Sequence, residues 1–325
     1  MVNDGVKRVR NYIRQNGQSR VVDMVRHLGI SKQALHKQLA KLIELGEVEK
    51  VGQPPKVFYS ISEKITLETK ATELDPDISK VIEEHYLYIS PGGRKMGGLA
   101  GFEAWCHKQN LPISKTATEY AVILEPYLKL RKNSLLDGTR KITTTFKKSF
   151  LDKLYYLDFY SIPRFGKTKL GQLVLYAKQS QDRQIIRELL AVVEPQIQKI
   201  VRTGNYDAVG FVPPSVKRQV QLMSELERSS LITLPKLGIE KIKTQVTVPQ
   251  KSLSKLEDRV ENAKATFVIT KKGHYNKVLL IDDVVGSGAT MNELAAKLKD
   301  GGIAKQVIGL ALVGSLKGYD VISEV

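Results

Sequence analysis

Two adjacent acidic residues, Asp282 and Asp283, are the side chains best placed for chemistry in this sequence. They follow the apolar run 278–281 and precede a glycine-rich segment, an order typical of a strand that leads through a loop into a helix. Adjacent carboxylates can accept hydrogen bonds from the vicinal hydroxyls of a ribose, and backbone N–H groups of a glycine-rich turn at a helix N-terminus can surround a phosphate. The pattern therefore predicts a pocket for the sugar and phosphate of a phosphoribosyl ligand. Its loop would be formed by Val285, Gly286, Ser287, Gly288, Ala289 and Thr290.

The complete pattern is more specific than the sequence of an ordinary glycine turn. A bare Gly-Ser-Gly after an acidic strand end would also suit such a turn, and a Walker loop is excluded because no Gly-Lys-Ser/Thr stands at the required spacing. The order here is four apolar residues, two acids, two apolar residues and then Gly-Ser-Gly-Ala-Thr. That order resembles the phosphoribosyl-diphosphate (PRPP) signature of type I phosphoribosyltransferases.

Further segments in the last half of the chain resemble the ComF-like phosphoribosyltransferases. Residues 171–178 are similar to the helix that opens the catalytic domain of that family, residues 212–215 to its diphosphate-binding loop, and residues 250–267 to its connecting loop. The sequence departs from the family at 217–221, where Lys-Arg-Gln-Val-Gln replaces Arg-Gly-Phe-Asn-Gln. It also has an extra residue before Arg259, and it lacks the cysteine-rich zinc module of the family.

The resemblance implies a reaction and a set of site residues. A nitrogen nucleophile would attack C1 of the PRPP ribose as diphosphate leaves, while Asp282 and Asp283 hold the ribose and stabilise positive charge on the ring. Mg²⁺ would be the cofactor, held through PRPP without a direct protein ligand. A lid over residues 243–262 would exclude water. The implied diphosphate loop comprises Pro214, Ser215, Lys217 and Arg218, and the implied lid residues are Gln250, Arg259 and Asn262.

Two alternatives to a DNA-associated phosphoribosyltransferase stay open. The first is a transcription regulator that binds PRPP or a nucleotide as an effector without turning it over. The second is a competence or DNA-uptake factor, which the biology of the ComF-like family suggests. The base side of the pocket would decide between an enzyme and a regulator, and the sequence pattern does not locate it.

The elements that would position the pocket indicate an α/β fold. From residue 151 to residue 325, helical segments alternate with β-prone runs near 208–212, 231–234, 266–269, 278–281 and 307–313. Such alternation predicts a parallel sheet covered by helices, with ligands beyond the carboxyl ends of its strands. Residues 63–150 are predicted to form a mostly helical connecting region, and their aromatic residues are expected to pack in a core rather than stack on bases.

Residues 1–62 are predicted to form a separate DNA-binding domain. Three helical segments, each ended by a glycine, precede two short β-prone runs. The residues of the third helix predicted to face inward are Ala34, Leu35, Leu39, Leu42 and Ile43. This order resembles the winged helix-turn-helix of bacterial regulators, with Ser31 as the N-cap of the recognition helix. The residues expected at DNA are Ser31, Lys32, Gln33, His36 and Lys37 in that helix and Lys50, Gln53 and Lys56 in the wing.

Charge and composition agree with a nucleic-acid partner. The 325 residues carry a formal charge of +17, and residues 1–62 contain eleven Lys and Arg against five Asp and Glu, an excess that suits phosphate contacts. A domain kept for protein contact or homodimerisation is the alternative. The single cysteine, Cys106, is expected to be a buried apolar residue. The first residues lack the apolar core of a secretory signal and no run reaches the length of a membrane span, so a cytoplasmic, soluble protein is expected.

Overall fold

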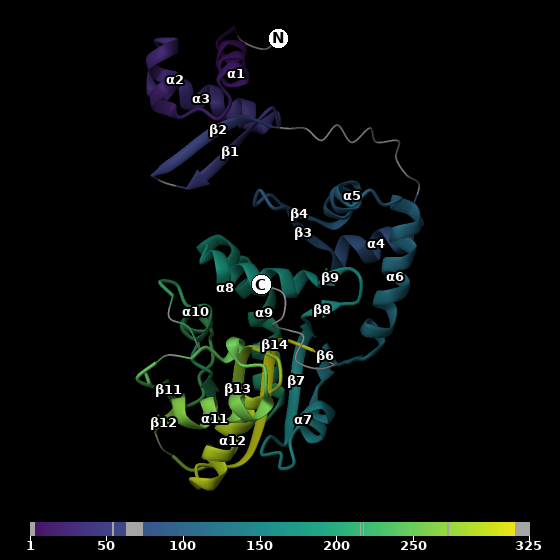
Figure 1. Cartoon of the computed structure of the whole chain (residues 1–325), viewed down its shortest axis with the longest axis vertical. Helices are drawn as coiled ribbons and strands as arrows, with labels where there is room; N and C mark the ends of the chain where they lie inside the picture. The colour runs from purple at the N-terminus through teal and green to yellow at the C-terminus, as the bar shows by residue number, and fades with distance from the viewer. Residues whose placement is uncertain are drawn as a thin grey trace. The chain divides into compact units, whose positions relative to one another are not determined.

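The computed structural model describes residues 4–53, 55–62, 74–214, 216, 218–246, 248–271 and 273–315. The chain divides into two compact units, Met1–Thr72 and Glu73–Val325, which are considered separately below. Figure 1 shows the elements of both units. No helix in the described ranges has both the length and the apolar composition needed to cross a bilayer.

The amino-terminal unit contains three helices and a β-hairpin, in the predicted order. The side chain of Ser31 accepts a hydrogen bond from the N–H of Ala34 at 3.2 Å and so caps the third helix. Gly29 ends the second helix in the left-handed conformation, as predicted. Ile43 was predicted to face inward but is 42 % exposed, because it lies near the end of the third helix, one residue beyond the buried Leu42. The elements are α1 (Asp4–Asn16), α2 (Val21–Leu28), α3 (Lys32–Glu44), β1 (Val48–Gln53) and β2 (Lys56–Ile61).

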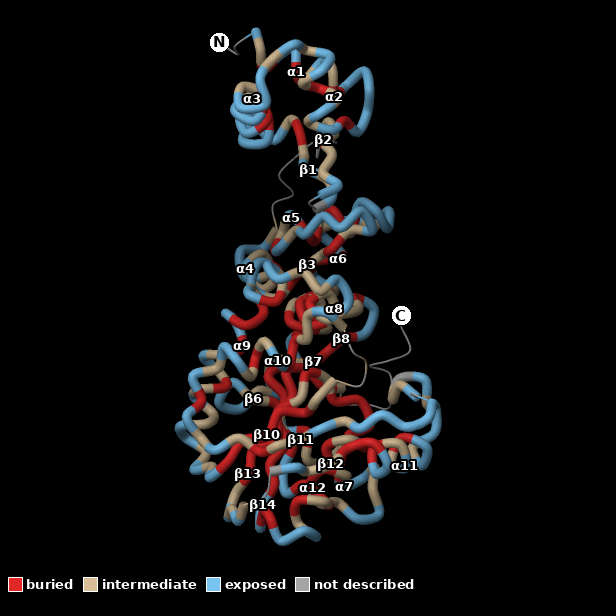
Figure 2. The backbone as a smooth tube through the Cα atoms, turned by 90° about the vertical axis from the view of Figure 1, so that its left-hand side faces the viewer, coloured by how far each residue is buried: buried red, intermediate tan, exposed pale blue. Residues whose placement is uncertain are grey.

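The larger unit is built on a mixed sheet of six strands, which confirms the α/β class. Four neighbouring strands are parallel, and two short strands continue the sheet in antiparallel fashion. Figure 2 shows that the long strands are among the most buried parts of this unit. In spatial order the strands are β10 (Ala208–Phe211), β13 (Tyr275–Val285), β14 (Ala304–Gly314), β7 (Lys153–Phe159), β6 (Leu135–Asp137) and β5 (Arg131–Lys132).

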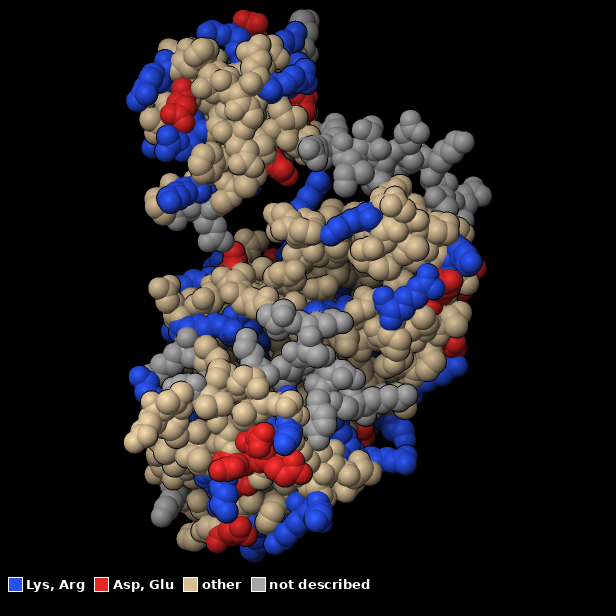
Figure 3. All heavy atoms as spheres, in the orientation of Figure 1, with Lys and Arg blue, Asp and Glu red and all other residues tan. Residues whose placement is uncertain are grey.

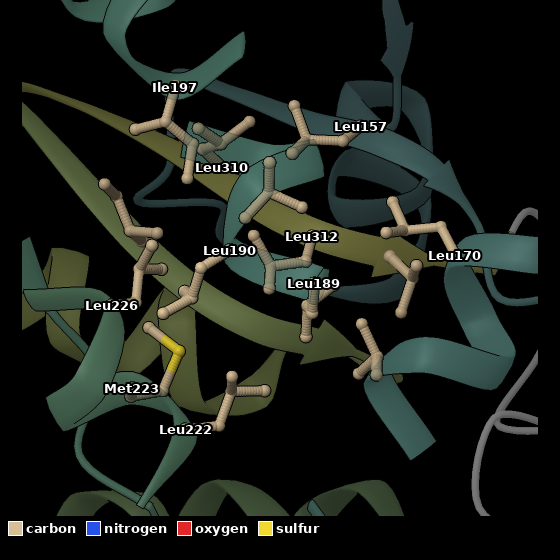
Figure 4. Close-up of a cluster of buried hydrophobic side chains, with 14 of the residues drawn as sticks. Leu157, Leu170, Leu189, Leu190, Ile197, Leu222, Met223, Leu226, Leu310 and Leu312 are labelled. Carbon is tan, nitrogen blue, oxygen red and sulfur yellow. The ribbon is translucent and has the colours of Figure 1, made fainter. Parts of the chain in front are cut away.

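Helices cover both faces of the sheet, because alternate residues of each strand point to opposite sides. In β13, Leu279 and Ile281 join one apolar core and Val278 and Leu280 join the other. Figure 4 shows the first core, where side chains of β7 and β14 gather with those of α8 (Lys169–Ser180), α9 (Arg183–Thr203) and α10 (Leu222–Ser229). The second core contains residues of α7 (Thr139–Thr145), α11 (Leu256–Thr266) and α12 (Ala289–Asp300).

The middle of the chain belongs to the larger unit and is less purely helical than predicted. Its aromatic residues pack together: Tyr86, Phe102 and Tyr120 are buried, which confirms the predicted core role, and Cys106 is buried with them. Residues 131–137 form β5 and β6 of the main sheet, which the helical pattern did not indicate. The remaining elements here are α4 (Pro76–His85), β3 (Leu87–Ile89), β4 (Lys95–Gly97), α5 (Gly98–Lys108) and α6 (Ile113–Lys129).

Two of the predicted strands are not part of the main sheet. Residues 231–234 form no strand, because the residues that follow them take the free edge of β10: Val209 donates to the carbonyl of Pro235 at 2.9 Å and accepts from Leu237 at 2.8 Å. The run at 266–269 becomes β12 (Phe267–Lys271), which pairs antiparallel with β11 (Gly238–Lys241) outside the main sheet. A small hairpin joins β8 (Ser161–Ile162) to β9 (Gly166–Lys167), and a 3₁₀ turn, η1, spans Gln250–Ser252.

Candidate functional site

A cleft of about 210 Å³ lies beyond the carboxyl ends of the parallel strands in the larger unit. Its walls come from segments far apart in sequence: the residues after β10, the end of β13 with the loop into α12, the last turns of α8, and η1 with α11. Ligands of α/β sheets bind at such an edge. The cleft therefore brings together most of the residues that the sequence pattern singled out.

The acidic pair lies on the last residues of strand β13 rather than after it. Asp282 is still paired with Ala311 of β14, and its Oδ1 accepts a hydrogen bond from the N–H of Asp283 at 2.8 Å. The Asp283 side chain is only 11 % exposed. Both residues line the cleft, so carboxylate oxygens form part of its floor.

The pKa of Asp282 is displaced from that of an ordinary aspartate. Burial raises the pKa of Asp282 well above its usual range, and the neighbouring charge of Asp283 raises it further, while Lys178 opposes the shift. The pair therefore carries less than its two formal negative charges at mildly acidic pH.

Lys178 is the functional side chain that sequence reasoning missed. Its Nζ lies 3.0 Å from both carboxylate oxygens of Asp283, from the last turn of α8, and it lines the same cleft. The signal is weak, because Lys178 stands 105 positions before its partner, at the end of a segment that is similar to the ComF-like opening helix. An ion pair of this separation leaves no local pattern in a sequence.

The glycine-rich loop enters α12 in the way that the pattern predicted. Gly288 adopts φ 84° and is the N-cap of α12, and the buried Ser287 accepts a hydrogen bond from the N–H of Ala289 at 3.3 Å. A Cβ on Gly288 would lie 2.2 Å from Cδ1 of Ile142 in α7. Glycine is thus required both by the left-handed backbone and by the close approach of α7. The loop residues Val285, Gly286, Ser287, Gly288, Ala289 and Thr290 all line the cleft.

The predicted diphosphate loop is only partly described. Pro214 and Arg218 line the cleft, whereas Ser215 and Lys217 lie outside the described residues. Within the described ranges, the Arg218 side chain has no hydrogen-bond or ion-pair partner. Its guanidinium is thus a candidate to meet an anionic ligand.

Of the three predicted lid residues, two line the cleft and one does not. Gln250 and Arg259 line the cleft, and they hold the segment together: Nε2 of Gln250 donates to the Arg259 carbonyl at 2.9 Å, and Nε of Arg259 donates to the Leu253 carbonyl at 2.7 Å. Asn262 does not line the cleft. Its Nδ2 donates to the carbonyl of Val248 at 3.2 Å, so its described contact lies within the lid.

The residues predicted to meet DNA lie at the start of α3 and on the hairpin of the amino-terminal unit. Lys32, Gln33, His36 and Lys37 are exposed on the first turns of α3. Lys50 and Lys56 are exposed on the hairpin, where the backbone of Gln53 pairs with that of Lys56. The face of this unit that is visible in Figure 3 carries further Lys and Arg side chains, drawn in blue.

The chemistry available in the cleft combines acids, cations and apolar surface. Tyr160, Val174 and Phe267 line it together with the charged residues. In the described part of the chain, no three His, Cys, Asp or Glu residues come close enough together to hold a metal ion. The sequence matches no protein-family model and no curated protein.

Proposed function

We propose that the larger unit is a ComF-like, type I phosphoribosyltransferase domain that binds PRPP with Mg²⁺ and transfers the phosphoribosyl group to or from a base. The observation that carries this proposal is one cleft in which the acidic pair and the glycine loop lie beside three cationic side chains, those of Lys178, Arg218 and Arg259. A sugar carrying phosphates needs both kinds of partner, hydroxyl acceptors and cations.

Each part of PRPP has a suitable partner in the cleft. Asp282 and Asp283 would accept hydrogen bonds from the ribose hydroxyls, and the N–H groups at the start of α12 would bind the 5′-phosphate, favoured by the helix dipole. Arg218 would bind the diphosphate. The apolar side chains of Tyr160, Val174 and Phe267 offer contact surface for a base.

The donor set in the cleft suits Mg²⁺ that arrives with its ligand. Carboxylate oxygens are ligands that Mg²⁺ accepts, and the ion keeps several waters or phosphate oxygens in protein sites. When bound, Mg²⁺ would supply neutralisation of the diphosphate charge. The residues near it would be Asp282 and Asp283, through the ribose hydroxyls that they hold.

The residues of the chain would act by holding and stabilising rather than by covalent chemistry. As the bond from C1 to the diphosphate breaks, the ring gains positive charge, which the carboxylate of Asp283 would stabilise, while Asp282 would hold the ribose hydroxyls. The negative charge that develops on the diphosphate would be stabilised by Arg218. Gln250 and Arg259, on the lid, would help to exclude water from the reacting centre.

Catalysis is tested by release of diphosphate from PRPP and Mg²⁺ with a broad panel of purine and pyrimidine bases. We expect release with at least one base, and we expect the double substitution Asp282→Asn with Asp283→Asn to abolish it. If the protein binds PRPP but releases no diphosphate with any base, the proposed transfer is contradicted and the proposed binding is not.

A non-catalytic regulator is the second candidate, favoured by the separate amino-terminal unit. Its three helices and hairpin, with exposed basic residues on α3, are similar to a winged helix-turn-helix that binds DNA. PRPP would then be an effector that changes DNA affinity. The coupling is measured as the DNA dissociation constant with and without PRPP at fixed salt, and an unchanged constant excludes it.

A further inference from the structure

The ion pair between Lys178 and Asp283 occupies the centre of the acidic site. The ammonium nitrogen lies 3.0 Å from both oxygens of the carboxylate, so it takes the position from which a cation would contact both oxygens at once. The Lys178 side chain is 30 % exposed and that of Asp283 is 11 % exposed, so solvent screens this pair only in part.

Several contacts hold Lys178 in this place. The helix that carries it is anchored by the buried Val174 and Ala177, and Lys178 lies in its last turn, where the helix dipole favours a positive charge. Just beyond the helix, Oε1 of Gln181 accepts hydrogen bonds from the N–H groups of Gln219, at 2.9 Å, and Val220, at 3.3 Å. The end of α8 is thus tied to the segment that follows the predicted diphosphate loop.

We infer that Lys178 is a resident counter-ion that prevents the acidic pair from binding a divalent cation on its own. Two adjacent carboxylates would otherwise attract such an ion, since carboxylates are its preferred protein ligands. With the ammonium in place, an incoming cation would meet a like charge at ion-pair distance from Asp283. For the proposed function, on which this consequence rests, a metal ion would enter the cleft with PRPP rather than before it.

The test is a titration of the full-length protein with Mn²⁺ alone, in the absence of any phosphate ligand. Binding is measured by calorimetry and by the electron paramagnetic resonance signal of free Mn²⁺. Four variants are compared with the wild type: Lys178→Met, Lys178→Arg, Lys178→Met with Asp283→Asn, and Lys115→Met. Lys115 is an exposed residue of α6, so its substitution controls for the change in total charge.

We expect Lys178→Met to bind Mn²⁺ at least about tenfold more tightly than the wild type, because that variant removes the like charge and keeps the Asp283 carboxylate. Lys178→Arg, Lys115→Met and the double variant should bind Mn²⁺ no more tightly than the wild type does. Equal Mn²⁺ affinity in the wild type and Lys178→Met would overturn the inference. Should Lys178→Met fail to fold, Lys178→Gln provides the same comparison.

The inference and the proposed function fail separately. The titration with Mn²⁺ alone decides the role of Lys178, whatever ligand the cleft binds. A parallel titration of the wild type with PRPP decides the ligand. A protein that gains a Mn²⁺ site in Lys178→Met but does not bind PRPP would contradict the proposed function and support the role of Lys178.

Discussion

At the scale of single residues, the two members of the acidic pair differ in their surroundings. Asp283 is neutralised by Lys178, whereas the pKa of Asp282 is raised by burial and by the charge beside it. Two adjacent carboxylates in a partly buried place cost stability when both are ionised. Their position on the floor of a cleft is typical of a binding site.

The raised pKa of Asp282 predicts a specific dependence of stability on pH. Above about pH 4 the unfolded chain loses the proton of this carboxyl while the folded chain retains it, so the free energy of unfolding should fall as the pH rises toward the raised pKa. Asp282→Asn cannot ionise and should lose less stability between about pH 5 and pH 8, by roughly 1 kcal/mol or more. Urea unfolding at the two pH values measures this difference.

The exposed Asp300 provides the control for that experiment, since Asp300→Asn also removes one carboxylate from the surface of the larger unit. It should leave the pH dependence of the wild type unchanged. An identical pH dependence in Asp282→Asn and the wild type would contradict the raised pKa.

Residues of the site differ in how far their roles are visible in the sequence. Asp282, Asp283 and the loop that follows them are contiguous, so their types and order predict a shared pocket, and the structure brings them to one cleft. Lys178 joins them only through the packing of α8 against the sheet. Asn262 was assigned by resemblance and does not line the cleft.

At the scale of elements, the connection from β13 to α12 shapes the site. Gly288 meets Ile142 of α7, and the buried Asn292 of α12 accepts a hydrogen bond from the N–H of Phe150 at 2.8 Å. The segment that follows α7 is thereby attached to α12. These contacts hold the loop and the first turns of α12 in place, as a preorganised site requires.

Gly288→Ala should destabilise the protein more than Gly302→Ala. Both glycines have positive φ, 84° and 65°, but a Cβ on Gly302 would meet no atom within 4 Å, whereas one on Gly288 would meet Ile142. Positive φ alone should cost about 1 kcal/mol, and the clash should add roughly 1–3 kcal/mol. Chemical denaturation of the two variants compares these costs directly, and equal destabilisation would contradict the close approach of α7.

The helices of the amino-terminal unit were well predicted because their signals are local. Ser31 caps α3, and the glycines that follow α1 and α2, Gly17 and Gly29, adopt the left-handed conformation. The two short strands β5 and β6 were not predicted, since runs of two and three residues carry no periodicity of their own. Residues 231–234 have the composition of a strand, yet the edge of β10 is taken by residues 235–237.

At the scale of the whole molecule, the formal charge of +17 and the exposed basic residues of α3 lead to a prediction for DNA. Lys32→Ala with Lys37→Ala should weaken DNA binding, because fewer DNA phosphates are neutralised and fewer counterions are released. The slope of log affinity against log salt should become shallower by about 0.9 for each phosphate that the variant no longer neutralises. Fluorescence anisotropy over a range of salt concentrations measures both quantities.

The matched control is Lys108→Ala with Lys115→Ala, which removes the same charge from exposed positions of the larger unit. This variant should keep the slope of the wild type. An equally shallow slope in both double variants would show that total charge, rather than α3, governs DNA binding.

The central claim is that the cleft beyond β13 binds PRPP through its acidic pair and glycine loop. Calorimetric titration of the wild type with PRPP and Mg²⁺, beside Asp282→Asn with Asp283→Asn, tests it most directly. We expect saturable binding in the wild type and an affinity lower by about tenfold or more in the double variant, since each hydrogen bond to a charged group contributes about 1.5–3 kcal/mol. Equal affinity in the two proteins, or no binding by the wild type, would contradict the claim.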